Sequence, residues 1–131
     1  MKRILIIDDE PSTLTILSEI LVGAGYEVIA AATGEEGLEI FEHDPADLVI
    51  TDMVMPVRDG LDTILELKKK EPDLPIIAIS AGGTIPKERY LEVARYMDNT
   101  STLEKPFTSD EILQLIKELF AADTPGGISL E

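Results

Sequence analysis

Five side chains in this sequence have types and positions suited to phosphoryl chemistry. Asp8 and Asp9 follow a first apolar run, and Asp52, Ser80 and Lys105 each follow a later short run. Crowded carboxylates raise one another's pKa or recruit a cation. An ammonium group attracts phosphate oxygens, and a hydroxyl can donate a hydrogen bond to one. If the fold gathers them, these groups could bind a metal ion and move a phosphoryl group onto an aspartate.

The available donors indicate a hard, oxygen-binding cation. The chain has no cysteine, which excludes thiolate metal sites, thiol nucleophiles and disulfides. Its one histidine, His43, lies in a segment with helical spacing, away from the candidate residues, and we expect it at the surface. Mg²⁺ suits three carboxylates, because it takes a few of them, keeps several waters and leaves positions for phosphoryl oxygens.

The elements that must position these residues alternate along the chain. Short aliphatic runs predict strands over residues 3–7, 28–31, 48–51 and 76–79, and residues 101–103 are the expected short fifth strand. Stretches with helical spacing follow them, beginning near Pro11, Thr33, Leu61 and Thr108, with a less regular one at Leu91–Met97. Glu36 and Glu111 complete capping-box patterns with Thr33 and Thr108, and Gly23 and Gly25 end the first helix.

This alternation predicts an α/β fold with a doubly wound parallel sheet. Strands that are apolar on both faces and alternate with helices form parallel sheets covered on both sides. Ligands of such sheets bind outside the carboxyl ends of the strands, near the topological switch point. We therefore expect the polar side chains that follow the strands to converge on one site.

Length and composition restrict the class of protein. The chain has 131 residues, the size of one domain, and its 44% hydrophobic and 5% aromatic content predicts an aliphatic core. The net charge of −15 is most simply explained by solubility, although such a surface repels nucleic acid and anionic lipid and attracts basic partners and divalent cations. The apolar run Ile4–Ile7 is too short for a signal peptide, so we expect a cytoplasmic protein without a membrane span.

In this order, these residues resemble the receiver domain of two-component response regulators. The segments concerned are Ile-Leu-Ile-Ile-Asp-Asp-Glu-Pro at 4–11, Thr-Asp-Met-Val-Met-Pro-Val-Arg-Asp-Gly at 51–60, Ile-Ser-Ala at 79–81 and Glu-Lys-Pro-Phe at 104–107. The resemblance covers roughly residues 2–121 and implies a flavodoxin-like (βα)5 fold whose five-stranded sheet has the order 2-1-3-4-5. We expect the receiver domain over 1–122 and a flexible C-terminal tail over 123–131.

The resemblance implies a metal-binding role for four positions. Asp9 and Asp52 would bind Mg²⁺ directly, and Asp8 would act mainly through a metal-bound water. The backbone carbonyl of Val54 would be a further ligand.

The resemblance also assigns the phosphoryl chemistry. Asp52 would be the phospho-acceptor, Lys105 would pair with its carboxylate and then with the phosphoryl oxygens, and Ser80 would move toward the phosphoryl group. The peptide bond between Lys105 and Pro106 is often cis in the family, and proline lowers the cost of that isomer.

A receiver domain is not a turnover enzyme, although it catalyses its own phosphorylation and dephosphorylation. The resemblance implies that a sensor histidine kinase or a histidine phosphotransfer protein donates the phosphoryl group. A downstream protein target or output domain would contact the altered surface, and a phosphorylation-dependent homodimer is compatible with this scheme. Neither nucleic acid nor a membrane is an expected direct partner.

The sequence departs from the family pattern at Thr102, where an aromatic residue is usual. This departure, with an irregular fourth helical stretch, leaves open a pseudo-receiver that only makes protein contacts. A haloacid-dehalogenase-type Mg²⁺ phosphatase is a weaker alternative. Such enzymes place a second acid two positions after the nucleophilic aspartate, whereas here the two aspartates are adjacent and position 10 is Glu10. A flavin carrier would need a loop rich in Ser, Thr and Gly in place of Asp-Asp-Glu-Pro.

Overall fold

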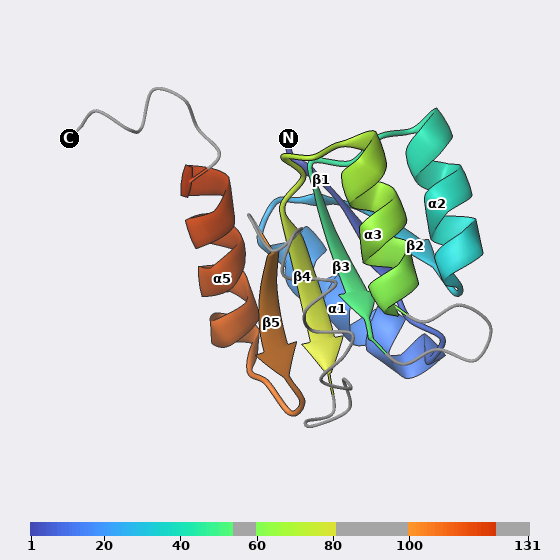
Figure 1. Cartoon of the computed structure of the whole chain (residues 1–131). Helices are drawn as coiled ribbons and strands as arrows, with labels where there is room; N and C mark the ends of the chain where they lie inside the picture. Colours follow the sequence, from blue (N-terminus) through green and yellow to red (C-terminus); the bar gives the residue numbers. More distant parts are fainter. Residues whose placement is uncertain (54–59, 81–99, 123–131) are drawn as a thin grey trace.

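The computed structural model describes residues 1–53, 60–80 and 100–122 (Figure 1). Five parallel strands form one sheet in the order β2-β1-β3-β4-β5, as predicted. The strands are β1 (Arg3–Ile7), β2 (Glu27–Ala31), β3 (Leu48–Asp52), β4 (Ile76–Ser80) and β5 (Thr100–Glu104). The helices are α1 (Pro11–Gly23), α2 (Gly34–His43), α3 (Gly60–Lys70) and α5 (Ser109–Ala122). The helical stretch predicted at Leu91–Met97 and the tail predicted at 123–131 lie outside the described residues.

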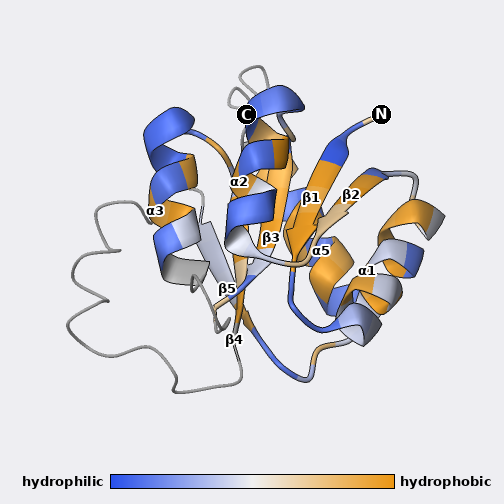
Figure 2. Cartoon of the chain, turned by 90° about the vertical axis from the view of Figure 1, so that its right-hand side faces the viewer, coloured by the Kyte–Doolittle hydropathy of each residue, from blue (hydrophilic) through white to orange (hydrophobic). Residues whose placement is uncertain are grey.

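The sheet is covered on both faces, because successive side chains of each strand point in opposite directions. Leu5 and Ile7 of β1 belong to the apolar cluster shared with α2 and α3. Ile4 and Ile6 belong to the cluster shared with α1 and α5. Figure 2 shows the hydrophobic strands between these two helical layers, which confirms the doubly wound α/β architecture.

Local hydrogen bonds explain where the helices begin. At α5, Glu111 N donates to Thr108 Oγ1 over 3.1 Å and Thr108 N donates to Glu111 Oε1 over 2.8 Å, a complete capping box. At α2, Glu36 N donates to the Oγ1 of Thr33 over 3.0 Å. The Glu36 carboxylate there accepts from Ala32 N, one residue before the expected donor.

The strand ends differ slightly from the predicted ranges. β3 continues through Asp52 and β4 through Ser80, because Asp52 pairs in register with Ile79 and Ser80 with Glu104. The backbone pairing of these two strands therefore includes Asp52 and Ser80, whereas β1 ends at Ile7, before Asp8. Lys105 follows β5 directly, so the candidate residues remain at the carboxyl edge of the sheet.

The end of α1 is formed by two glycines, as expected. Gly23 is its last residue, and Gly25 has a φ of +96°, a backbone conformation that favours glycine. Within the described residues, no helix combines the length and apolar character that crossing a bilayer requires.

Candidate metal centre

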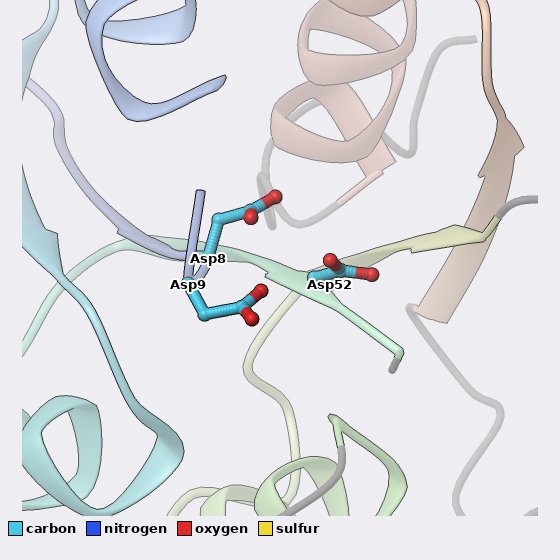
Figure 3. Close-up of side chains that lie close together, drawn as sticks. All are labelled: Asp8, Asp9 and Asp52. Carbon is cyan, nitrogen blue, oxygen red and sulfur yellow. The ribbon is translucent and has the colours of Figure 1, made fainter. Parts of the chain in front are cut away.

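Three carboxylates meet at the carboxyl ends of β1 and β3. One oxygen each of Asp8, Asp9 and Asp52 can be chosen so that all three lie within 4.8 Å of one another. Figure 3 shows the three side chains grouped beside the two strand ends. Asp8 and Asp52 are 1% and 8% exposed, whereas Asp9 is exposed. The cluster therefore has a buried side and a side open to solvent.

Strand pairing places these residues. β1 and β3 are neighbours with Ile7 opposite Thr51, so the residues that follow, Asp8 and Asp52, lie side by side. Asp8 N donates to Ala31 O over 3.1 Å, which extends the pairing of β1 with β2 beyond the strand. The chain then turns toward α1, and Glu10 N donates to Asp8 Oδ1 over 2.9 Å.

The second oxygen of Asp8 favours a cation at this place. Among the described residues, Oδ2 of Asp8 is buried and accepts no hydrogen bond. Burial raises the pKa of Asp8 above 3.8, opposed by the Glu10 N–H and assisted by the negative charge of Asp52. A buried polar atom without a hydrogen bond is costly, and a metal ion would remove that cost. The three carboxylates, which include that of Asp8, are hard oxygen donors and fit Mg²⁺.

Lys105 is the cation that the described residues place beside the carboxylates. Its Nζ lies 3.9 Å from Asp8 Oδ2, 3.9 Å from Asp52 Oδ2 and 3.4 Å from Glu10 Oε1. Burial alone would lower the pKa of Lys105, but the charges of Asp52 and Asp8 outweigh it and raise the pKa above 10.5. The lysine is therefore charged at neutral pH. The peptide bond between Lys105 and Pro106 is cis, as the resemblance implied.

The other candidate residues lie as follows. Ser80 ends β4, the strand next to the one that ends in Asp52. Val54 lies outside the described residues, so its carbonyl as a ligand stays a prediction. His43 is exposed on α2, with Nδ1 3.0 Å from Glu39 O, which confirms its expected surface position.

Two observations were not foreseen. The first is the contact of Glu10 with Lys105, because the sequence pattern did not indicate a role for Glu10 in the site. Its position directly after the acid pair and directly before α1 was the only available signal. The second is a groove of about 560 Å³ beside Thr102, which is exposed on β5. The groove is lined by Thr102 and Leu103 of β5 and by residues of α5.

The chain belongs to the response regulator receiver domain family. The model of that family matches residues 4–117. The transcriptional regulatory protein GlrR of Escherichia coli is 34% identical over 123 residues, which cover 94% of this chain and 27% of GlrR. The probable transcriptional regulator ycf27 of Porphyridium aerugineum is 48% identical over 118 residues, covering 90% of this chain and 48% of that protein. The chain thus spans about a quarter to a half of these curated relatives.

Similar solved structures belong to the same family. The receiver domain protein (CheY-like) of Methanospirillum hungatei has a TM-score of 0.84 at 29% identity, covering 94% of this chain and 97% of that one. The response regulator TrrA of Thermotoga maritima, solved in complex with Mg²⁺ and BeF, has a TM-score of 0.77 at 36% identity, covering 91% and 99%. The chain is therefore a two-component receiver domain, which is neither a phosphatase of the haloacid-dehalogenase type nor a flavin carrier.

Proposed function

We propose that Asp52 accepts the phosphoryl group and that Asp8, Asp9 and Asp52 bind Mg²⁺. The observation that carries the proposal is the position of Lys105, whose Nζ lies 3.9 Å from a carboxylate oxygen of Asp52 beside the three-acid cluster. A nucleophilic carboxylate, a metal site and a fixed cation are the parts that phosphoryl transfer to an aspartate requires. The solved complex of TrrA with Mg²⁺ and BeF supports the same pair of ligands here.

Asp52 is better placed as the acceptor than the other two acids. Asp8 is 1% exposed and its Oδ1 already accepts the Glu10 N–H, so an incoming phosphorus atom has little access to it. Asp9 is exposed, but the ion pairs of Lys105 are with Asp8, Glu10 and Asp52. Asp52 combines limited exposure, 11% for its side chain, with a neighbouring ammonium group.

In the proposed transfer, an Asp52 oxygen attacks the phosphorus of a phosphohistidine. The new O–P bond forms while the N–P bond breaks, and its electron pair leaves with the imidazole nitrogen. Lys105 stays protonated and orients the phosphoryl oxygens, and Ser80 donates a hydrogen bond to one of them. Asp8, Asp9, Asp52 and, as a further proposed ligand, the Val54 carbonyl would hold Mg²⁺, which would supply positive charge beside the transferring group. Attack of water on phosphorus later releases phosphate and restores the carboxylate.

The proposal extends to partners. The donor is a sensor histidine kinase or a histidine phosphotransfer protein, and the receiver of the signal is a protein target or an output domain. Relatives named as transcriptional regulators support an output that controls transcription, and the chain covers only part of their length. The net charge of −15 argues against direct binding of DNA by this domain. A cytoplasmic location, a phosphorylation-dependent homodimer and the absence of turnover chemistry belong to the same proposal.

Mass spectrometry of the intact protein tests the acceptor. We expect one added phosphoryl group after incubation with acetyl phosphate and Mg²⁺, and none when EDTA replaces Mg²⁺. Asp52→Asn should stay unmodified, whereas Asp110→Asn, an exposed acid in the first turn of α5, should be modified like the wild type. A folded wild-type protein that remains unmodified and binds neither Mg²⁺ nor beryllofluoride would be a pseudo-receiver.

A further inference from the structure

The hydrogen bond of Lys105 goes to a residue outside the carboxylate cluster. Its Nζ donates to Glu10 Oε1 over 3.4 Å, whereas the distances of 3.9 Å to Asp8 and Asp52 exceed hydrogen-bond length. Three carboxylates therefore share one ammonium group, and the closest belongs to Glu10. A phosphoryl group on Asp52 would replace the carboxylate of Asp52 with a more highly charged group that competes for the same ammonium.

Glu10 is held in place by the backbone of the site itself. Its N–H donates to Asp8 Oδ1 over 2.9 Å, so the main chain of Glu10 supports one site residue while its side chain contacts another. The side chain does not cap α1, although Glu10 is the N-cap residue, and it is 61% exposed. The same Oε1 accepts a long bond of 3.5 Å from Thr13. Among the described residues, the contact with Lys105 is the only ion pair of Glu10.

We propose that Glu10 is a positioning residue that competes with the phosphoryl group for Lys105. In the unphosphorylated domain, the Glu10 carboxylate holds the ammonium group at the rim of the carboxylate cluster. Transfer of Lys105 to the phosphoryl oxygens breaks this ion pair, so Glu10 weakens retention of the phosphoryl group. Glu10 also keeps Lys105 from moving closer to Asp52 and Asp8, where the positive charge of the ammonium group would weaken the binding of Mg²⁺. The inference rests on the proposed function, because it assumes phosphoryl chemistry at Asp52.

Shortening the side chain separates contact from charge. Glu10→Asp keeps the charge but withdraws the carboxylate by one methylene. Glu104→Asp is the matched control, since Glu104 is exposed, precedes Lys105 and forms no ion pair with it in the described structure. Partly exposed ion pairs are weak, so Glu10→Asp should bind beryllofluoride about two- to fivefold more tightly at saturating Mg²⁺. The same variant should bind Mg²⁺ alone about twofold more weakly, and Glu104→Asp should match the wild type.

Calorimetric titration of the full chain measures both dissociation constants, and thermal unfolding confirms that each variant is folded. The opposite changes for the two ligands are the signature of a displaced lysine, because general damage to the site would weaken both. Glu10→Asp should no longer weaken Mg²⁺ binding when Lys105 is absent, so the double variant with Lys105→Met should bind Mg²⁺ like Lys105→Met alone. If wild type binds beryllofluoride and Glu10→Asp matches it, or weakens both ligands, the role of Glu10 is refuted while the proposed function stands. If folded wild type binds neither ligand, the proposed function fails first.

Discussion

Gly37 of α2 packs directly on Ile7 of β1. A Cβ atom at Gly37 would lie 2.8 Å from Cγ1 of Ile7 and closer still to its Cδ1. Ile7 is 1% exposed and immediately precedes Asp8, so its side chain cannot move without disturbing the core beside the site. The missing side chain at Gly37 therefore sets how closely α2 approaches the strand that leads into the carboxylate cluster.

Gly37→Ala should destabilise the domain by about 1–3 kcal/mol, because overpacking of the core outweighs the gain in helix propensity. Gly23→Ala is the matched control, since a Cβ there meets nothing within 4 Å. The free energy of unfolding of Gly23→Ala should equal that of the wild type or exceed it by up to about 1 kcal/mol. Urea denaturation measures both free energies of unfolding. Equal stability of the two variants would show that Ile7 can move aside.

Replacement of Asp8 should expose a conflict between stability and metal binding. The folded chain raises the pKa of Asp8 above 3.8, mainly by burial, so the folded state holds this proton more tightly than the unfolded state. The protonated Asp8 carboxyl therefore contributes its full stabilisation below pH 3.8. This contribution is lost as the pH rises through the raised pKa. In EDTA at neutral pH, Asp8→Asn should be more stable than the wild type by on the order of 1 kcal/mol. The difference should shrink as the pH falls toward 3.8.

Urea denaturation over a pH series gives the test for Asp8. Adding Mg²⁺ should stabilise the wild type more than Asp8→Asn, because only the intact cluster binds the ion well. A variant that is less stable than the wild type in EDTA at neutral pH would contradict the expected cost of the buried charge.

The capping box of α5 offers a prediction away from the site. Thr108→Ala removes the acceptor of the Glu111 N–H and should cost about 1 kcal/mol, because an N-terminal donor of the helix loses its partner. Thr108→Ser keeps the hydroxyl and should stay within about 0.5 kcal/mol of the wild type. Thermal and urea unfolding of the two variants would measure the difference. Similar losses in both would assign the effect to the methyl group of the threonine instead.

Much of the fold and the convergence of four candidate residues could be predicted from sequence because their signals are local. The aliphatic runs before Asp8 and Asp52 indicate both a strand and the edge to which the next residue belongs, and Lys105 follows a shorter strand whose last apolar residue is Leu103. The capping boxes depend on residues three positions apart, and both expected bonds from Glu36 N and Glu111 N form. Strand ends were less accurate, because backbone pairing continues through Asp52 and Ser80 whatever their polarity.

Contacts between distant residues were not predictable in this way. Glu10 and Lys105 are 95 positions apart, and no spacing rule relates them. The close approach of Gly37 to Ile7 depends on how α2 lies on the sheet. Lys68 is 2% exposed and donates to Leu74 O over 2.6 Å, although it begins a run of three lysines that sequence alone does not distinguish. Each of these features depends on the tertiary packing of whole elements.

Lys105 should oppose metal binding while it assists phosphoryl transfer. Its ammonium group lies 3.9 Å from oxygens of both Asp8 and Asp52, where a unit charge acts on each with about 1 kcal/mol even in a water-like dielectric. Lys105→Met should therefore bind Mg²⁺ about five- to tenfold more tightly, as titration calorimetry would measure. Its modification by acetyl phosphate should nevertheless slow, because the phosphoryl oxygens lose their cation. Lys117→Met removes the same charge from an exposed position on α5 and should leave both properties unchanged. If Lys105→Met instead bound Mg²⁺ more weakly, the lysine would be needed to arrange the carboxylates rather than to compete for them.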